Sequence, residues 1–206
     1  MLTASDAATF ERCMAVGGIA LFPADTVYGF ACDARTRESV ERLYLLKRRP
    51  LSKPSAVMLF SLELALAAVP ELGPRTRSAL EALLPGGVTL LLANPAHRFP
   101  LACGDDPETL GLRVPALPPA ADALGAVNWP ILQSSANRAG EPEARTVGEV
   151  PAGLREAADL VLDAGPLPGT PSTVVDLRRF EARRQWSIAR AGAVGEDVVD
   201  AALAAL

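Results

Sequence analysis

Residues 19–29, Ile-Ala-Leu-Phe-Pro-Ala-Asp-Thr-Val-Tyr-Gly, pass from an aliphatic run directly into a polar turn. The run Ile19 to Phe22 is typical of a buried strand, which ends at Pro23 because proline has no N–H to donate. Residues 23–29 then place a carboxylate, a hydroxyl and a phenol in a turn closed by Gly29. Taken alone, this turn is explained equally well by an ordinary Asp/Thr turn and by a ligand site at a strand end.

Outward from this segment, aliphatic runs alternate with helical periodicity, the pattern of an α/β domain. Helices are expected at residues 5–16, 38–46, 61–68, 75–84, 120–124 and 196–206. Strands are expected at residues 19–22, 56–60, 88–93, 110–114, 131–133, 160–162, 173–177 and 186–190. The last two are expected to pair with each other across a polar turn at 178–184. The spacing is too irregular for a βαβ repeat, so we expect a twisted, open, mixed (parallel and antiparallel) sheet flanked by helices. The 18 prolines and 16 glycines are spread through the connections, which favours a single domain over residues 1–206.

The composition excludes several classes of protein. A net charge of −4 and a pI near 5.1 argue against a dedicated nucleic-acid binder. No apolar stretch is long enough to span a membrane, and no signal pattern opens the chain. The three cysteines are scattered and unpaired by spacing, which is typical of reduced thiols in a cytoplasmic protein. His97 is the single histidine; it excludes multi-histidine metal centres, and its turn-like surroundings predict a surface position.

Both lysines of the chain, Lys47 and Lys53, lie in the segment Lys-Arg-Arg-Pro-Leu-Ser-Lys at 47–53. Lysine is a compact, strongly hydrated point charge on a flexible stem, which suits an anionic oxygen. The segment therefore indicates an anion site, with a basic, solvated loop after a helix as the alternative.

Two further polar clusters lie where strands are expected to end. Gln-Ser-Ser-Ala-Asn at 133–137 offers neutral donors for anionic oxygens, although a helix cap followed by an Asx-turn explains it too. Arg113, with Ser172, Thr173 and Arg190 from later strands, forms the other cluster, and an arginine at a strand end can grip a carboxylate. Neither GxxxxGK[ST] nor GxGxxG occurs, so a nucleotide site here would need scattered cations and hydroxyls.

Taken in order, these clusters resemble the motifs of the YrdC-like family in its short, single-domain form. The motifs are PADTVYG at 23–29, KRRP at 47–50, PGGVT at 85–89, RVP at 113–115, SSANRAG at 134–140, STVVD at 172–176 and RAG at 190–192. Each is weak alone, but seven in order over residues 18–192 are specific. Ala24 and Gly87 stand where the family pattern has threonine and proline, and Met58 and Leu59 where many relatives have a histidine.

The resemblance implies an L-threonylcarbamoyladenylate synthase, a nucleotidyltransferase that converts L-threonine, bicarbonate (or CO2) and ATP to L-threonylcarbamoyl-AMP and pyrophosphate. A downstream threonylcarbamoyl transferase would then modify the adenosine beside the anticodon of tRNA, and weak contact with tRNA or RNA is possible. The nucleophiles belong to the substrates, so the enzyme must supply positioning and charge neutralisation. A chain with one histidine can do that.

The resemblance also implies roles for particular residues. Lys47, Arg49, Ser135 and Asn137 match the basic and polar tetrad, and are expected to be catalytic and to hold the phosphates and the carbamate. Lys53, Thr109, Arg145 and Arg190 are expected to bind ATP with them. Thr26, Tyr28, Arg113, Ser134 and Ser172 are expected to line the threonine pocket, with Arg113 as the carboxylate clamp. Mg²⁺ would be bound through the ATP phosphates and not by a protein metal site.

The alternative is a YrdC-like paralogue that binds nucleotide or double-stranded RNA and lacks synthase activity. Its RNA surface would use a basic cluster such as Arg178, Arg179, Arg183 and Arg184, which a solvated hairpin explains too. A pure interaction module would not require polar clusters at so many strand ends. Threonine-dependent release of pyrophosphate distinguishes the synthase from both.

Overall fold

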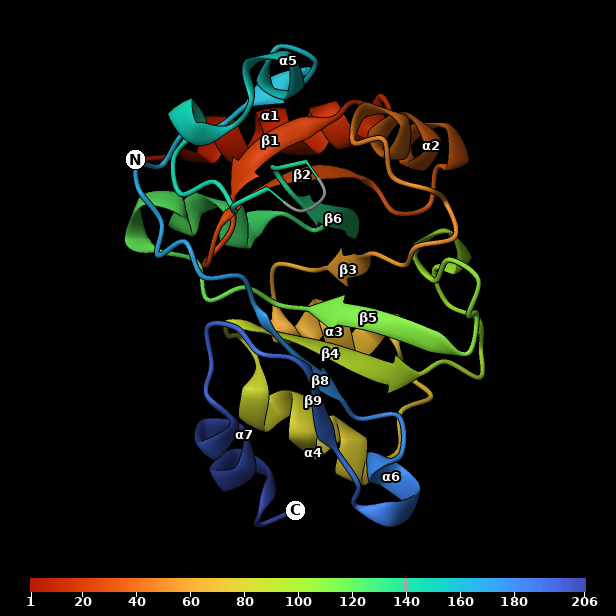
Figure 1. Cartoon of the computed structure of the whole chain (residues 1–206). Helices are drawn as coiled ribbons and strands as arrows, with labels where there is room; N and C mark the ends of the chain where they lie inside the picture. Colours follow the sequence, from red (N-terminus) through yellow and green to blue (C-terminus); the bar gives the residue numbers. More distant parts are fainter. Residues whose placement is uncertain (139–140) are drawn as a thin grey trace.

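The computed structural model describes residues 1–138 and 141–206, and these residues form one sheet with helices on both faces (Figure 1). The strands are β1 (Ala20–Pro23), β2 (Tyr28–Asp33), β3 (Ala56–Met58), β4 (Val88–Ala93), β5 (Thr109–Arg113), β6 (Ile131–Ser135), β7 (Leu160–Val161), β8 (Thr173–Asp176) and β9 (Ser187–Arg190). Their order in the sheet is β7-β1-β2-β6-β3-β5-β4-β8-β9. The pairs β1/β7, β3/β5 and β4/β8 are parallel and the other pairs antiparallel, which confirms the predicted open mixed sheet.

The helices of the described residues are α1 (Ala4–Ala15), α2 (Arg37–Leu46), α3 (Leu62–Ala68), α4 (Pro74–Leu83), α5 (Ala152–Arg155), α6 (Phe180–Arg183) and α7 (Glu196–Leu203), with 3-10 turns η1 (Pro100–Ala102), η2 (Pro119–Ala126) and η3 (Val147–Glu149). Five of these helices begin and end within about three residues of the predicted positions, whereas the two four-residue helices, α5 and α6, were not predicted. Helix α1 starts one residue earlier than expected, because Thr3 and Asp6 form a reciprocal capping box that fixes its first turn. Ser61 caps α3 by accepting a hydrogen bond from the N–H of Leu64 at 3.2 Å. None of the described helices is long and apolar enough to cross a membrane.

Two apolar clusters assign the helices to the faces of the sheet. In the smaller cluster, α1 and η2 pack against one face of β1, β3 and β6, where the rings of Phe10, Phe22 and Phe60 meet with centroids 5.5 to 6.3 Å apart. In the larger cluster, α2, α3, α4 and α7 pack with alternate residues of β2, β4 and β5. Helix α1 and the 3-10 turn η2 cover this face from β1 to one end of β6 and β3. The remainder of that face, over β5, β4 and β8, holds the site.

The principal element that the sequence prediction missed is β2. The polar turn was expected to end at Gly29, but Tyr28 already begins a six-residue strand whose residues are all buried. Strand β2 pairs with β1 as a hairpin, with Phe22 opposite Gly29, so the turn itself is only the few residues between Pro23 and Tyr28. The strand is buried on both faces and therefore shows no polar alternation that would have revealed it.

Smaller differences follow from local backbone preferences. The helix expected at 120–124 is the 3-10 turn η2, and the turn expected at 178–184 contains α6. Strand β6 runs on to Ser135, where it pairs with Gly29 of β2. Ser134 and Ser135 therefore belong to the strand and do not follow it.

Candidate functional site

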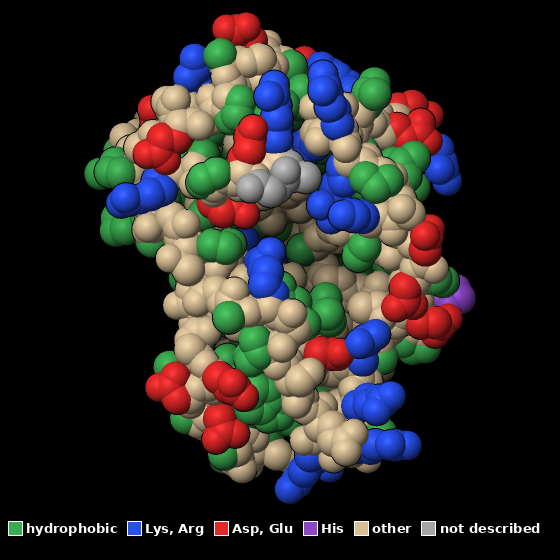
Figure 2. Space-filling model, viewed as in Figure 1, with side chains coloured by type: hydrophobic (Ala, Val, Ile, Leu, Met, Phe, Trp, Pro, Cys, Tyr) green, Lys and Arg blue, Asp and Glu red, His purple; other side chains and the backbone are tan. Residues whose placement is uncertain are grey.

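A cavity of about 480 Å³ opens on the part of the sheet that α1 and η2 leave uncovered. Its floor follows the alternation of the strands. In β5, Thr109, Gly111 and Arg113 line the cavity, while Leu110 and Leu112 point into the core. The molecular surface is hollowed near the middle of the face in Figure 2, with Lys and Arg side chains around the hollow. A volume of this size is typical of a small-molecule site.

Several of the predicted site residues meet in this cavity although they come from distant parts of the sequence. The predicted residues among its lining are Arg49, Thr109, Arg113, Ser134, Ser135, Ser172 and Arg190. The lining also includes polar residues that were not among the residues expected to bind the substrates of the synthase, namely Ser55, Thr89, Cys103, Asp106, Gln133, Glu143 and Arg178. Thr89 and Gln133 could have been found from the sequence, since Thr89 ends the quoted PGGVT motif and Gln133 directly precedes SSANRAG, two residues from Ser135 on the same strand.

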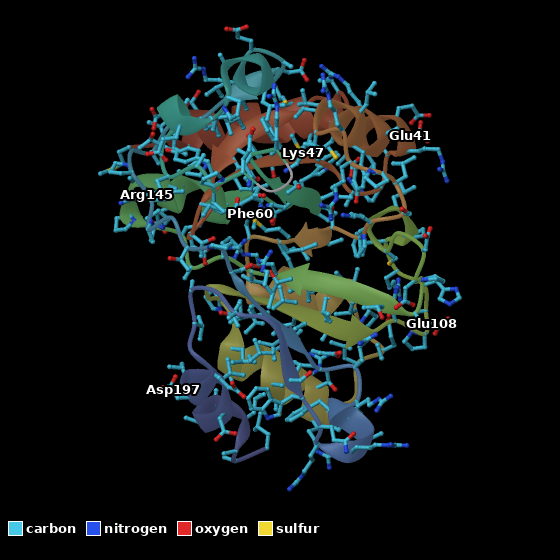
Figure 3. All side chains as sticks on the ribbon, in the orientation of Figure 1. Glu41, Lys47, Phe60, Glu108, Arg145 and Asp197 are labelled. Carbon is cyan, nitrogen blue, oxygen red and sulfur yellow. The ribbon has the colours of Figure 1, made fainter. Side chains whose placement is uncertain are left out.

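Lys47 lies directly after α2 and is buried, with 7% of its surface exposed. Its ammonium donates a hydrogen bond to the backbone carbonyl of Ser135, so it joins the end of α2 to β6 (Figure 3). Burial, and to a lesser extent the nearby charge of Arg49, lower the pKa of Lys47 to about 8, although the charge of Glu143 opposes both effects. Lys47 is therefore a buried cation behind the cavity wall and not part of a solvated loop.

The rest of the lysine loop is held by Tyr44 of α2. The Tyr44 hydroxyl lies 2.8 Å from the Lys53 carbonyl and 2.8 Å from the Ser55 hydroxyl. Arg49 donates to the Pro54 carbonyl at 2.6 Å, and its guanidinium carbon lies 5.8 Å from the centre of the Tyr44 ring. These contacts direct Arg49 into the cavity, whereas the Lys53 side chain is exposed and contributes only its backbone to this loop.

Ser135 and Asn137 form a short polar unit at the end of β6. The Ser135 hydroxyl donates to the Asn137 side-chain oxygen at 2.6 Å, and the Asn137 amide donates to the Glu141 carbonyl at 2.7 Å. Asn137 is buried, so this unit fixes the chain where the strand ends. The last two residues of the SSANRAG motif, 139 and 140, lie outside the described residues.

Arg113 is buried at the end of β5 and forms an ion pair with Asp25. The same nitrogen, Nη2, donates to the Thr26 hydroxyl at 2.7 Å. Burial lowers the pKa of Arg113, and the charge of Asp25 opposes that shift. Thr26 therefore lies beside the cavity and acts on it through Arg113.

Ser172 and Arg190 form the adjoining wall. The Ser172 hydroxyl shares a hydrogen bond of 2.8 Å with Thr89, and Arg190 donates to the Ser172 carbonyl at 2.7 Å and to its hydroxyl at 3.3 Å. Thr109 accepts a long hydrogen bond of 3.4 Å from Arg178. The wall thus presents cations and hydroxyls together, as anionic oxygens require.

The structure places Tyr28 and Arg145 away from the cavity lining. The Tyr28 hydroxyl lies 2.9 Å from the Asp163 carboxylate and 2.8 Å from the Gly165 carbonyl, and it accepts from the Ala164 N–H at 3.0 Å. Burial raises the pKa of this phenol to about 12. Arg145, labelled in Figure 3, is exposed and donates to the Leu167 carbonyl at 3.2 Å. Tyr28 therefore fixes the segment after β7, because its hydroxyl is engaged there.

The residues that depart from the family pattern are either buried apolar side chains or, at Gly87, a glycine closely approached by a neighbouring segment. Ala24, Met58 and Leu59 are buried in the core, so they add no polar group to the site. A Cβ at Gly87 would lie 3.2 Å from the Cβ of Ala193, so glycine suits the close approach of these two segments. Among the described residues, no group of three or more His, Cys, Asp or Glu side chains could hold a metal ion.

Comparison with known proteins identifies the family of the chain. The family model Sua5_yciO_yrdC, described as "Telomere recombination", matches residues 12–192. Threonylcarbamoyl-AMP synthase of Xanthomonas campestris is 33% identical over 175 residues, which cover 83% of this chain and 92% of that protein. The protein of the same name from Nitrosococcus oceani is 33% identical over 153 residues, covering 71% of this chain and 78% of that protein.

Solved structures share the fold. Sua5 of P. abyssi complexed with L-threonine aligns with a TM-score of 0.85 at 23% identity, covering 98% of this chain and 58% of that chain. E. coli YciO aligns with a TM-score of 0.80 at 20% identity, covering 97% of this chain and 95% of that chain. This chain thus spans somewhat more than half of the P. abyssi Sua5 chain and nearly all of YciO. The chain belongs to the Sua5/YciO/YrdC family.

Proposed function

We propose that this protein is an L-threonylcarbamoyladenylate synthase, which joins L-threonine, bicarbonate or CO2, and ATP to give L-threonylcarbamoyl-AMP and pyrophosphate. The observation that carries the proposal is the cavity in which Arg49, Arg113 and Arg190 converge with serine hydroxyls. The substrates of this reaction are anions at both ends, because ATP carries a triphosphate and threonine a carboxylate. Relatives over 30% identical across most of the chain carry the name of this enzyme.

In this proposal, the ATP phosphates and the carbamate are bound by Lys47, Arg49, Ser135 and Asn137. Lys47 and Arg49 lie on the α2 side of the cavity. The Ser135 carbonyl accepts a hydrogen bond from the Lys47 ammonium, which links Ser135 to this side. The threonine carbamate attacks the α-phosphorus and pyrophosphate leaves, so negative charge shifts toward the leaving oxygens. Fixed cations and hydroxyl donors stabilise that charge without reorganisation. The roles of Thr109 and Arg190, which line the cavity, as further ATP contacts stay part of the proposal. Lys53 and Arg145 lie outside the lining, so they would contact only a part of ATP that extends beyond the cavity.

In this proposal, L-threonine is bound by Arg113 and Ser172, with Thr26 and Ser134 beside them. Arg113 is the cation best placed for a carboxylate, because it is buried and its guanidinium is held in one orientation. A buried arginine with a fixed orientation binds a carboxylate with little loss of side-chain entropy. This arrangement would place the threonine amine toward the middle of the cavity, where CO2 and the α-phosphate meet.

Mg²⁺ would enter with ATP, bound mostly by the phosphates. Asp106 and Glu143 are carboxylates of the cavity lining, and a single carboxylate with phosphate oxygens and water suffices for this ion. The ion would supply charge neutralisation on the triphosphate. A downstream transferase that passes the threonylcarbamoyl group to tRNA completes the proposed pathway.

The test is an assay of the purified protein with ATP, Mg²⁺, bicarbonate and labelled L-threonine. The proposal predicts pyrophosphate release that requires both threonine and bicarbonate, together with a threonine-labelled AMP adduct. Release of pyrophosphate that does not depend on threonine would overturn it. Omitting bicarbonate from degassed buffer is the matched control, because a simple aminoacyl adenylation would continue without it.

A further inference from the structure

Asp25 joins two segments that form one wall of the cavity. It lies in the turn between β1 and β2, and its carboxylate accepts hydrogen bonds from Nη2 of Arg113 and, at 3.1 Å, from the backbone N–H of Ala116. The side chains of Arg113 and Asp25 are only 3% and 5% exposed. An ion pair so well shielded from water holds its partners in a defined geometry, because breaking it would leave a charge buried alone.

The same contacts leave part of Arg113 available to a ligand. Its Nη2 is occupied by Asp25 and by the Thr26 hydroxyl. Its Nε is buried and has no hydrogen-bond partner among the described residues. A guanidinium carries five N–H donors in a rigid plane, and Arg113 lines the cavity. Fixing one nitrogen therefore fixes the direction of all the remaining donors.

The charges of Arg113, Arg190 and Asp25 at this wall favour a carboxylate over a phosphate. Arg190 lies near enough to Arg113 to lower its pKa, while Asp25 acts in the opposite direction. Two cations and one carboxylate leave an excess of one positive charge. Such a wall suits a monoanionic carboxylate, whereas two unopposed cations would suit a phosphate equally well.

We propose that Asp25 is a positioning residue for the amino-acid substrate, which orients Arg113 and offsets its charge so that this wall binds a carboxylate in preference to a phosphate. The proposal rests on the proposed function, because it takes L-threonine as the substrate. Asp25 acts through Arg113 and has no contact of its own with the reacting atoms in this scheme.

Calorimetric titration with L-threonine, with L-threoninamide (which lacks the carboxylate) and with ATP tests the proposal without turnover. For Asp25→Ala the expected Kd for L-threonine rises roughly tenfold, as for loss of one charge-assisted contact. The Kd for L-threoninamide should stay within about twofold, because this ligand lacks the carboxylate that Arg113 binds. The Kd for ATP should stay unchanged or fall, because without Asp25 the cations of this wall are unopposed and suit a phosphate. Asp122→Ala, an exposed aspartate in η2, is the matched control and should change none of the three.

Asp25→Asn is the second variant, because it keeps the shape if the alanine variant does not fold. It still accepts from Arg113 but loses the charge and the acceptor for Ala116, so a smaller rise in the threonine Kd is expected. Threonine affinity equal to wild type in either folded variant would overturn the proposal, as would equal losses for threonine and ATP. If wild-type protein does not bind L-threonine at all, the proposed function fails instead, so the two failures are distinguishable.

Discussion

At the scale of single residues, burial decides which of the predicted polar groups can do chemistry. Lys47 and Arg113 are both buried; the Ser135 carbonyl holds Lys47, and Asp25 and the Thr26 hydroxyl hold Arg113. Burial of a cation without full compensation lowers stability, and proteins retain such groups where function requires them. Tyr28 is equally buried, but its hydroxyl is engaged by the segment after β7.

Replacement of Lys47 by methionine should separate stability from activity. Methionine matches the length of the buried stem and removes the ammonium, so the free energy of unfolding should rise by about 1 kcal/mol. Synthase turnover should fall by roughly 10²-fold or more, as for loss of a preorganised charge contact. Thermal unfolding and pyrophosphate release measure the two effects. Arg48→Met, at the neighbouring exposed position, is the control and should leave both nearly unchanged; lost activity in that variant would contradict the assignment.

The pKa of Lys47 predicts how ATP affinity depends on pH. Because burial and Arg49 lower this pKa from 10.5 to about 8, the ammonium loses its proton as the pH rises through about 8. The Kd for ATP should therefore increase between pH 7 and pH 9.5, approaching roughly tenfold per pH unit above the pKa. Lys47→Arg should weaken this dependence, since arginine stays charged. A flat profile in the wild-type protein would show that Lys47 is not the cation that binds ATP.

Tyr28→Phe tests the placement of the phenol outside the cavity. The variant loses hydrogen bonds to Asp163, Gly165 and Ala164, so the free energy of unfolding should fall by about 1–3 kcal/mol. The KM for threonine should remain within about twofold of wild type, because the hydroxyl does not reach the site. A large rise in KM at unchanged stability would mean that Tyr28 lines the threonine pocket as the family resemblance implies.

At the scale of elements, the strand ends and the local pairing of β8 with β9 could be predicted, but the pairing of strands distant in sequence could not. The aliphatic runs of β1, β4 and β5 stand out because polar residues and turns bound them. Strand β2 was not predicted because Tyr28 and Gly29 were interpreted as the end of a turn, although both are buried strand residues. The Arg113–Asp25 ion pair depends on the β1/β2 hairpin, which was not predicted, because Asp25 lies in its turn. No local sequence pattern could therefore have placed these two side chains together.

Gly29 allows β2 and β6 to pair closely beside the site. A Cβ at this position would lie 2.7 Å from Nε2 of Gln133 and 3.1 Å from the carbonyl of Ser134. Gly29→Ala should therefore displace β6, lower the free energy of unfolding by about 1–3 kcal/mol and weaken ATP binding. Gly153→Ala in α5, where a Cβ meets nothing within 4 Å, is the matched control and should be neutral or stabilising. Chemical denaturation and ATP titration would contradict this account if the two variants behaved alike.

At the scale of the whole molecule, strand order creates the site. The sheet places β6, from residues 131–135, between β2 and β3, and places β8 beside β4. Residues separated by more than a hundred positions thus meet on one open face. The mixed α/β class followed from the alternation of helices and strands, but the strand order rests on long-range pairing that spacing does not encode. The order of the seven motifs implied the site only through resemblance to a family.

The most direct test of the synthase assignment follows the carbon of bicarbonate. The protein is incubated with ATP, Mg²⁺, L-threonine and ¹³C-bicarbonate, and the AMP-linked product is analysed by mass spectrometry, with Lys47→Met and Arg48→Met in parallel. The account predicts an L-threonylcarbamoyl-AMP product that carries the label in its carbamoyl carbon, formed by wild type and Arg48→Met and nearly absent with Lys47→Met. An AMP–threonine product without the label, or pyrophosphate release with no AMP-linked threonine, would contradict it.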